Sequence, residues 1–130
     1  MDFVQRNKDR EQAMMDCWDS LTKECREAII GSWNQKYPNW TWNPDPQDKN
    51  QFCISRNVGG KVFNLCVQFD DDSGEVKARG GTAKEGPVLS LHKIVYNRDS
   101  GAWLQGSDGK LNVDDVVDAI LWPFLKKYRL

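Results

Sequence analysis

One segment near the middle of the chain constrains the fold more than any other. Residues 61–69 alternate in polarity, and every second position from the third onward is strongly apolar: Phe63, Leu65, Val67 and Phe69. A repeat of two residues places these side chains on one side of a β-strand and their neighbours on the other. We therefore predict a strand that buries one face and leaves the other face more polar.

Turn sequences border this strand and determine its partners. Val58-Gly59-Gly60 stands before it, after a short predicted strand at residues 51–56. Asp72-Ser73-Gly74 follows it, and residues 75–79 return as a third strand. Tight turns join antiparallel strands, so this part of the chain is predicted to fold as a meander.

The same turn chemistry recurs later in the sequence. Residues 96–103 repeat the pattern of residues 69–76, in which an aromatic residue and a polar run end in Ser-Gly before the chain returns. Two matching turns do not make a repeat protein, which needs three or more stacked units. We interpret the second segment as another hairpin, which gives an antiparallel five-stranded β-meander.

Before the strands, the sequence predicts a long amphipathic helix. Its apolar positions recur at the period of one helical face: Met14, Trp18, Leu21, Cys25, Ala28, Ile29 and Trp33. Gly31 weakens this helix and Pro38 ends it. Asp19 and Ser20 are good capping residues, so a break there, which would make a helical hairpin, is the alternative.

A second amphipathic helix is predicted at the end of the sequence. Asn112 is a suitable N-cap, and Asp115 completes an arrangement like a capping box. The predicted buried stripe consists of Val113, Val116, Val117, Ile120, Leu121, Phe124 and Tyr128. Pro123 lies within this helix and is expected to kink it or to split it after Trp122.

The segment between the first helix and the first strand, residues 37–50, is predicted to be a loop. Several prolines there oppose regular structure. The loop holds the aromatic residues Tyr37, Trp40 and Trp42. Tryptophan and tyrosine are enriched at binding hot spots, so these three are candidate binding residues. The alternative is that Trp40 and Trp42 fold back to cover the edge of the core.

Together these elements predict one α+β domain that spans residues 1–130. A chain of this length can bury one core without disulfides or a metal ion. We expect the N-terminal helix and the C-terminal helix to pack on the same face of the sheet, because only one face is strongly apolar. The opposite face then stays polar and open to solvent.

Charge and hydropathy exclude several classes of protein. The 18 basic residues nearly balance the 19 acidic ones, and a net charge of −1 leaves no global electrostatic footprint for nucleic acid. No apolar run approaches the roughly 20 residues that span a bilayer, and the N-terminal residues lack the apolar core of a signal peptide. We expect a cytoplasmic protein with no membrane partner. Its cysteines are then expected to be reduced: Cys17, Cys25, Cys53 and Cys66.

No residue pattern identifies a catalytic or metal centre. His92 is the one histidine, and its pairing with Cys53 or Cys66 has no local support. The cysteines show no Cys-x-x-Cys spacing, and the acidic run at residues 70–75 fails the EF-hand pattern. Residues 80–84 miss the P-loop spacing. We therefore predict no catalytic residues, no metal and no cofactor.

The polar face of the sheet is the second candidate binding surface, besides the aromatic loop. Its predicted members include Gln68, Lys77, Arg79 and His92, which make it mildly basic. Such a face suits an acidic protein partner or a nucleic-acid strand, although it lacks the aromatic residues on which bases stack. The alternative is a solvated surface without a ligand.

These features favour a non-enzymatic protein-binding module, such as a small inhibitor, an immunity-type protein, an adaptor or a chaperone. A protein partner is therefore expected. The alternative is a protein that binds single-stranded nucleic acid or a nucleotide through the basic sheet face. A small nuclease-type enzyme that uses His92 and Arg79 is a third hypothesis, and it rests on fold-level analogy alone.

Overall fold

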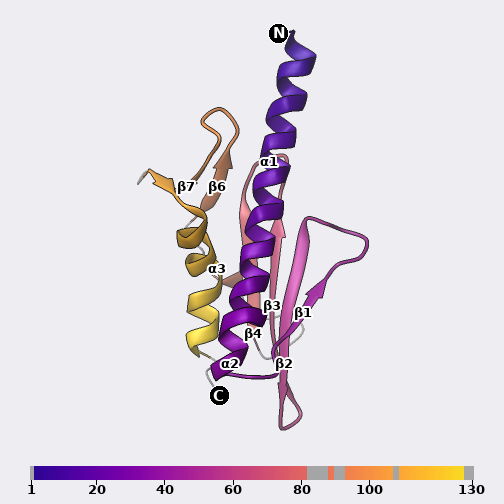
Figure 1. Ribbon diagram of the computed structural model, residues 1–130, viewed down its shortest axis with the longest axis vertical. Coiled ribbons are helices and arrows are strands. Elements are labelled where there is room, and N and C mark those ends of the chain that lie inside the picture. The colour runs from indigo at the N-terminus through magenta and orange to yellow at the C-terminus, as the bar shows by residue number, and fades with distance from the viewer. Residues whose placement is uncertain (1, 82–87, 90–92, 107–108, 128–130) are drawn as a thin grey trace.

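The fold combines a long N-terminal helix, two antiparallel sheets and a C-terminal helix (Figure 1). The computed structural model describes residues 2–81, 88–89, 93–106 and 109–127. Within them, one hydrophobic core cluster draws side chains from both long helices and from both sheets. The predicted α+β class is confirmed.

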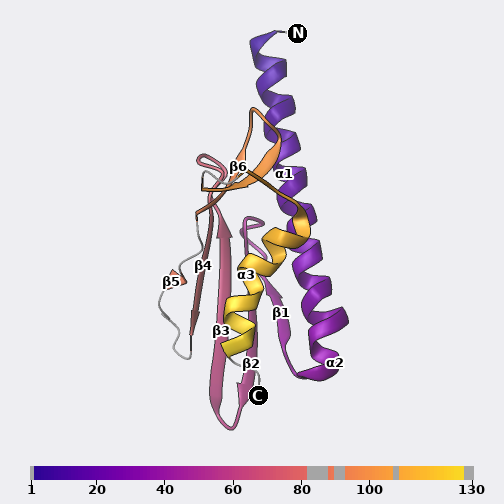
Figure 2. The same cartoon turned by 90° about the vertical axis from the view of Figure 1, so that its left-hand side faces the viewer.

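The N-terminal helical segment is continuous. Helix α1 (Phe3–Arg26) leads directly into the π-helical segment η1 (Glu27–Trp33) and then into the short α2 (Asn34–Lys36). The alternative of a helical hairpin is wrong, because Asp19 and Ser20 lie inside α1. The buried face follows the predicted stripe through Met14, Trp18, Leu21, Cys25 and Ile29. The first turns of α1 extend beyond the sheets (Figures 1 and 2).

Sheet A, the larger sheet, places its antiparallel strands side by side in chain order. They are β1 (Thr41–Pro44), β2 (Gln51–Val58), β3 (Lys61–Phe69), β4 (Val76–Gly81) and the two-residue β5 (Val88–Leu89). The strand predicted from alternation is β3, with the predicted bounds. Its apolar positions are buried as expected: Phe63, Leu65, Val67 and Phe69.

Sheet B overturns the prediction of a single five-stranded meander. It contains β6 (Ile94–Asn97), β7 (Ala102–Gln105) and β8 (Lys110–Leu111), in that order. Among the described residues, the second hairpin pairs within itself, and an isolated bridge between Glu75 and Val95 links it to sheet A near the turn before β4. The strands therefore divide between two sheets.

Strand β1 was not expected, because residues 37–50 were predicted to be a loop. Thr41–Pro44 pairs with β2, from Thr41 opposite Ser55 to Pro44 opposite Phe52. The strand lies at the edge of sheet A, where no strand of the described residues pairs with its outer row of backbone groups. Pro44 is compatible with this position, because an edge strand tolerates a residue that cannot donate to the ladder.

Helix α3 (Val113–Lys127) runs through Pro123 without being split. Asn112 caps its start as predicted, since Asn112 Oδ1 accepts a hydrogen bond from the backbone N–H of Asp115 at 2.8 Å. Its buried residues are Val116, Val117, Ile120, Leu121, Phe124 and Leu125. Helices α1 and α3 lie side by side along one face of sheet A (Figures 1 and 2), as expected.

The two hairpin turns that resemble each other in sequence share one geometry. Asp70 Oδ1 accepts hydrogen bonds from the backbone N–H groups two and three residues later, at 2.9 and 3.2 Å. Asn97 Oδ1 does the same at 2.9 and 3.0 Å. Each turn then ends in a glycine with a positive φ, 77° at Gly74 and 66° at Gly101. The interpretation that one type of turn is used twice is confirmed.

The Asp70 carboxylate predicts a pH dependence of stability. The backbone N–H groups of Ser73 and Asp72, and to a smaller extent the charge of Lys77, hold the pKa of Asp70 below its ordinary value. A lowered pKa stabilises the folded protein above the ordinary carboxyl pKa, and this contribution is lost as the pH falls through the folded-state pKa. Asp70→Asn keeps a hydrogen-bond acceptor like that of Asn97 but removes the charge. We expect its melting temperature at neutral pH to be lower than that of the wild-type protein.

The difference between the two melting temperatures is expected to shrink as the solution is acidified, and melting curves recorded over a pH series measure it. A difference that stays constant down to strongly acidic pH would contradict the role of the charge.

Candidate functional site

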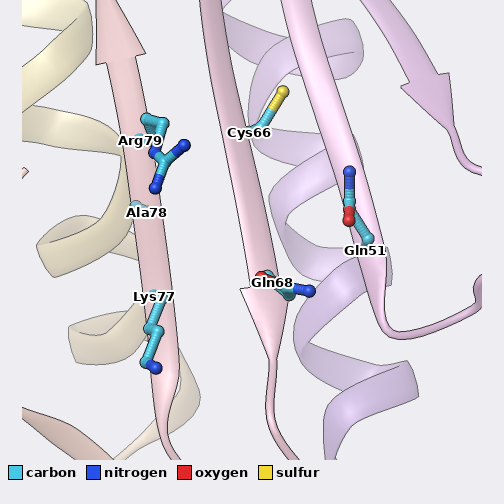
Figure 3. A pocket seen from close by; sticks show the side chains of 6 residues that line it. All are labelled: Gln51, Cys66, Gln68, Lys77, Ala78 and Arg79. Atoms are coloured by element: carbon cyan, nitrogen blue, oxygen red, sulfur yellow. The ribbon is translucent and has the colours of Figure 1, made fainter. Parts of the chain in front are cut away.

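The face of sheet A opposite the helices is open within the described part of the chain. Figure 3 views this outer face, and the helices lie behind the strands. Its side chains alternate with the buried ones, as the strand period requires. The outer face, as we define it, consists of Thr41, Asn43, Gln51, Cys53, Ser55, Asn64, Cys66, Gln68, Lys77 and Arg79. Three residues predicted for it, Gln68, Lys77 and Arg79, are therefore together.

A hollow of about 260 Å³ lies on the outer face. Strand register explains why its residues gather there: Gln68 lies opposite Gln51 on one side and Lys77 on the other, and Cys66 lies opposite Arg79. These five residues and Ala78 line the hollow (Figure 3). Two cations and two amides therefore surround one shallow space.

The charge of this hollow is positive. Lys77 and Arg79 are exposed and make no ion pair with any acid that the structure describes. Two acids, Asp70 and Asp71, line an adjoining hollow together with Gln68 and Lys77. Arg79 lies farther along β4 and lines only the first hollow. Among the described residues, Lys77 therefore shares a hollow with two acids, whereas Arg79 does not.

Beside the hollow, the outer face carries a network of neutral polar side chains. Thr41 Oγ1 and Ser55 Oγ are 2.9 Å apart, and Asn43 Nδ2 donates to Ser55 Oγ at 2.9 Å. These contacts join β1 to β2 and satisfy the polar groups among themselves. The network stabilises the edge of the sheet, and it presents no charge.

Cys53 and Cys66 form a disulfide between β2 and β3. They are directly opposite in the strand register, their Cα atoms are 4.1 Å apart, and both are half-buried. The expectation that all four cysteines are reduced is wrong for this pair, because the register of the hairpin brings the two sulfur atoms together. Cys17 and Cys25 are free. Burial raises the pKa of Cys25 to about 12, as for a small apolar core residue.

Two of the aromatic candidates from the predicted loop pack against the core. Trp40 is only 2% exposed, and its ring meets the ring of Phe124 edge-on at 5.7 Å between centroids. Trp42 is half-buried and stacks on Phe52 at 4.5 Å. Asn34 fixes the approach to β1, since its amide both donates to and accepts from the backbone of Trp40. Trp40 and Trp42 therefore cover the edge of the core, which was the alternative reading.

Tyr37, the third aromatic candidate, belongs to an aromatic surface at the end of the helical segment. Its ring stacks on that of Trp33 at 4.5 Å, and Trp33 meets Trp122 of α3 edge-on at 6.2 Å. Lys36 lies over the Tyr37 ring at 5.9 Å. With Ser32, these residues line a hollow of about 330 Å³. Trp122 is 47% exposed.

Sequence reasoning did not select Trp33 or Trp122 as site residues. One signal was present for Trp122, which falls outside the helical stripe that α3 buries. Trp33 stands at the start of the aromatic segment that continues to Trp42, but the helical periodicity assigns it to the core. The π-helical geometry of Glu27–Trp33 changes the rotation per residue, and π-helical turns are often found at functional sites. This local geometry places Trp33 partly at the surface, beside Trp122.

Catalytic and metal-binding arrangements find little support among the described residues. Cys53 and Cys66 are bonded to each other, so neither is a thiol nucleophile in this state. His92 lies outside the described residues. The carboxylates of Asp70, Asp71 and Asp72 lie near one another at the turn. We assign Asp70 to the turn itself, since its Oδ1 already accepts two backbone hydrogen bonds.

Comparison of the chain with protein-family models, with curated proteins and with solved structures finds no match in any of the three. Over the part of the chain that the structure describes, no helix has both the length and the apolar character needed to cross a bilayer. The functional argument therefore rests on the two surfaces described above.

Proposed function

We propose that this protein is a non-enzymatic protein-binding module, of the kind represented by small inhibitors, immunity-type proteins, adaptors and chaperones, and that it works in the cytoplasm. The observation that carries the proposal is the aromatic surface formed by Trp33, Tyr37 and Trp122. A tryptophan that is 47% exposed keeps much apolar area in contact with water. Covering that area with a partner is favourable.

The composition of this surface resembles that of protein interfaces. Tryptophan and tyrosine dominate binding hot spots, because they bury a large area and lose few rotamers. Here Trp33 is held between Tyr37 and Trp122, so the rings are ordered before a partner arrives. Ile30, three residues before Trp33, is a further exposed apolar side chain of the same helical segment, at 43%. Preorganised aromatic groups reduce the entropy cost of binding.

A second candidate function is the binding of single-stranded nucleic acid or a nucleotide on the outer face of sheet A. Lys77 and Arg79 at its hollow favour an anionic ligand. Among the described residues of that face there is no aromatic ring on which a base would stack. We therefore place this function second.

The proposal is tested by replacing residues of each surface and measuring partner capture. We expect Trp122→Ala to reduce capture of the partner from a lysate of the source cells about tenfold or more, as the loss of a hot-spot residue does. Phe3→Ala is the matched control, because Phe3 is 70% exposed at the far end of α1 and should have no effect. Melting temperatures of both variants establish that they are folded.

A double variant, Lys77→Glu/Arg79→Glu, separates the two functions. If the aromatic surface binds the partner, this variant captures it as well as the wild-type protein does. If capture survives Trp122→Ala but is lost in the double variant, the aromatic surface is not the site. Binding of a fluorescent oligothymidine at low salt, lost in the same double variant, would favour the second function.

A further inference from the structure

The Cys53–Cys66 disulfide occupies a position that differs from that of a buried structural cross-link. It lies on the open outer face of sheet A, and both of its residues are half-buried rather than fully enclosed. Cys66 lines the hollow of about 260 Å³, with its sulfur directed toward β2 (Figure 3). A small molecule can therefore approach the sulfur pair from solvent without displacing a helix.

The neighbours of the disulfide favour negative charge on sulfur. Arg79 is the residue opposite Cys66 on β4, and Lys77 lines the same hollow. On the β2 side, the neighbours of Cys53 are the neutral residues Gln51 and Ser55, two positions away on the same face. Positive charge close to a cysteine stabilises the thiolate over the thiol. A thiolate formed at Cys66 would therefore be stabilised.

We propose that the Cys53–Cys66 pair is a thiol–disulfide exchange site whose co-reactants are low-molecular-weight thiols. In the first step, a thiolate RS⁻ attacks Cys53 Sγ. The new S–S bond joins the sulfur of RS⁻ to Cys53 Sγ. The electron pair of the broken bond stays on Cys66 Sγ, which becomes a thiolate beside Arg79. A second thiolate then attacks the RS sulfur of this mixed disulfide, which releases Cys53 as a thiolate and forms RSSR. Two protons from the two thiols complete the dithiol.

This choice of attacked sulfur follows from the charges. Exchange is faster when the leaving sulfur is the more stable thiolate. Cys66 meets that condition because of Arg79, whereas Cys53 has no cation among its described neighbours on the outer face. Attack in line with the S–S bond reaches Cys53 Sγ from the side that faces away from Cys66, where Asn43 of β1 is the residue opposite Cys53. Lys77 and Arg79 therefore act on the leaving Cys66 sulfur and not on the path of the attacking thiolate.

The fold does not depend on the bond to keep the two strands together. β2 and β3 are joined by a tight turn and pair from Gln51 opposite Gln68 to Val58 opposite Lys61. Cys53 and Cys66 lie within this ladder, so the reduced residues remain opposite each other and can form the bond again. The proposal is independent of any protein partner and goes beyond the binding function proposed above.

The other two cysteines provide an internal reference. Cys25 is fully buried in the core. Cys17 is half-buried on α1, and its Sγ lies 3.8 Å from the hydroxyl oxygen of Tyr96. Neither residue lies near Lys77 or Arg79 on the outer face. They should therefore react more slowly than the reduced Cys66 with any reagent that alkylates thiols.

The first test equilibrates the folded full-length protein with mixtures of reduced and oxidised glutathione, blocks free thiols and determines the mass of the intact protein. We expect the Cys53–Cys66 bond to open and close reversibly as the mixture changes, without loss of the far-ultraviolet circular dichroism signal. A bond that stays closed in a large excess of reduced glutathione, and opens only after denaturation, would overturn the proposal.

The second test measures the thiolate at Cys66 in Cys53→Ser, with the alkylation of each cysteine followed by peptide mass spectrometry. We expect a Cys66 pKa below the value of about 8.5 for a free cysteine. Arg79→Gln in the same background should slow alkylation at neutral pH several-fold, whereas Lys61→Gln, a matched loss of charge at the hairpin turn, should not. A Cys66 pKa at or above the ordinary value, or one that Arg79→Gln leaves unchanged, would contradict the proposed role of Arg79.

Discussion

Trp18→Ala is expected to lower the free energy of unfolding by about 3–5 kcal/mol. Trp18 is fully buried between the helices and sheet A. Its ring stacks on Phe69 at 5.0 Å and on Phe52 at 5.9 Å, and its Nε1 donates a hydrogen bond to the carbonyl of Lys49 at 2.9 Å. Truncation leaves a cavity that these neighbours cannot fill, because Phe52 and Phe69 are held in the paired strands β2 and β3.

Urea unfolding followed by circular dichroism measures this loss, with Trp122→Ala as the comparison. Trp122 is 47% exposed, so its truncation removes less buried area and should cost about 1 kcal/mol. The comparison also shows whether any loss of partner capture in Trp122→Ala arises at the surface rather than from unfolding. Equal losses in the two variants would show that Trp18 does not anchor the core.

The predictions that succeeded depend on repeats within single elements. The alternation of residues 61–69 located β3, and the helical stripe from Met14 to Ile29 located the buried face of α1. In both cases the chain must bury one face, and the period of the element decides which residues lie on it. The cap at Asn112 and the turn at Asp70 were predictable for a similar reason, since each is made by a few adjacent residues.

The predictions that failed depend on contacts between distant segments. The division into two sheets is decided by where the second hairpin meets Glu75, and no local pattern encodes that meeting. β1 exists because β2 presents a free edge to Thr41–Pro44. The disulfide needs the register that places Cys53 opposite Cys66. The prediction of reduced cysteines rested on the expected cytoplasmic location and not on this register.

The candidate surfaces were predictable to different degrees. Gln68, Lys77 and Arg79 follow from the alternation that fixes the buried face, so the outer face could be foreseen. The aromatic surface could not, because it needs the π-helical turn before Trp33 and the packing of α3 beside it. Only Tyr37 was selected in advance.

Gly74→Ala is the second substitution for which we expect a large loss of free energy of unfolding, because Gly74 lies at the contact between the two sheets. Gly74 has a φ of 77°, a conformation that side chains rarely adopt. Its carbonyl accepts a hydrogen bond from the backbone N–H of Tyr96 at 2.7 Å, which ties the turn before β4 to β6. A Cβ at this position would overlap the carbonyl oxygen of Tyr96, and a backbone atom cannot rotate away as a side chain can.

Gly101 is the matched control, because it ends the other turn of the same type. Its φ is 66°, and the nearest atom to an added Cβ is the Tyr96 hydroxyl oxygen at 3.8 Å. Gly101→Ala should therefore cost only the conformational strain, about 1 kcal/mol. Gly74→Ala adds the overlap and the weakened hydrogen bond, for a total of about 3 kcal/mol. Urea unfolding of both variants measures the difference, and similar losses would mean that the contact between Gly74 and Tyr96 does not hold sheet B against sheet A.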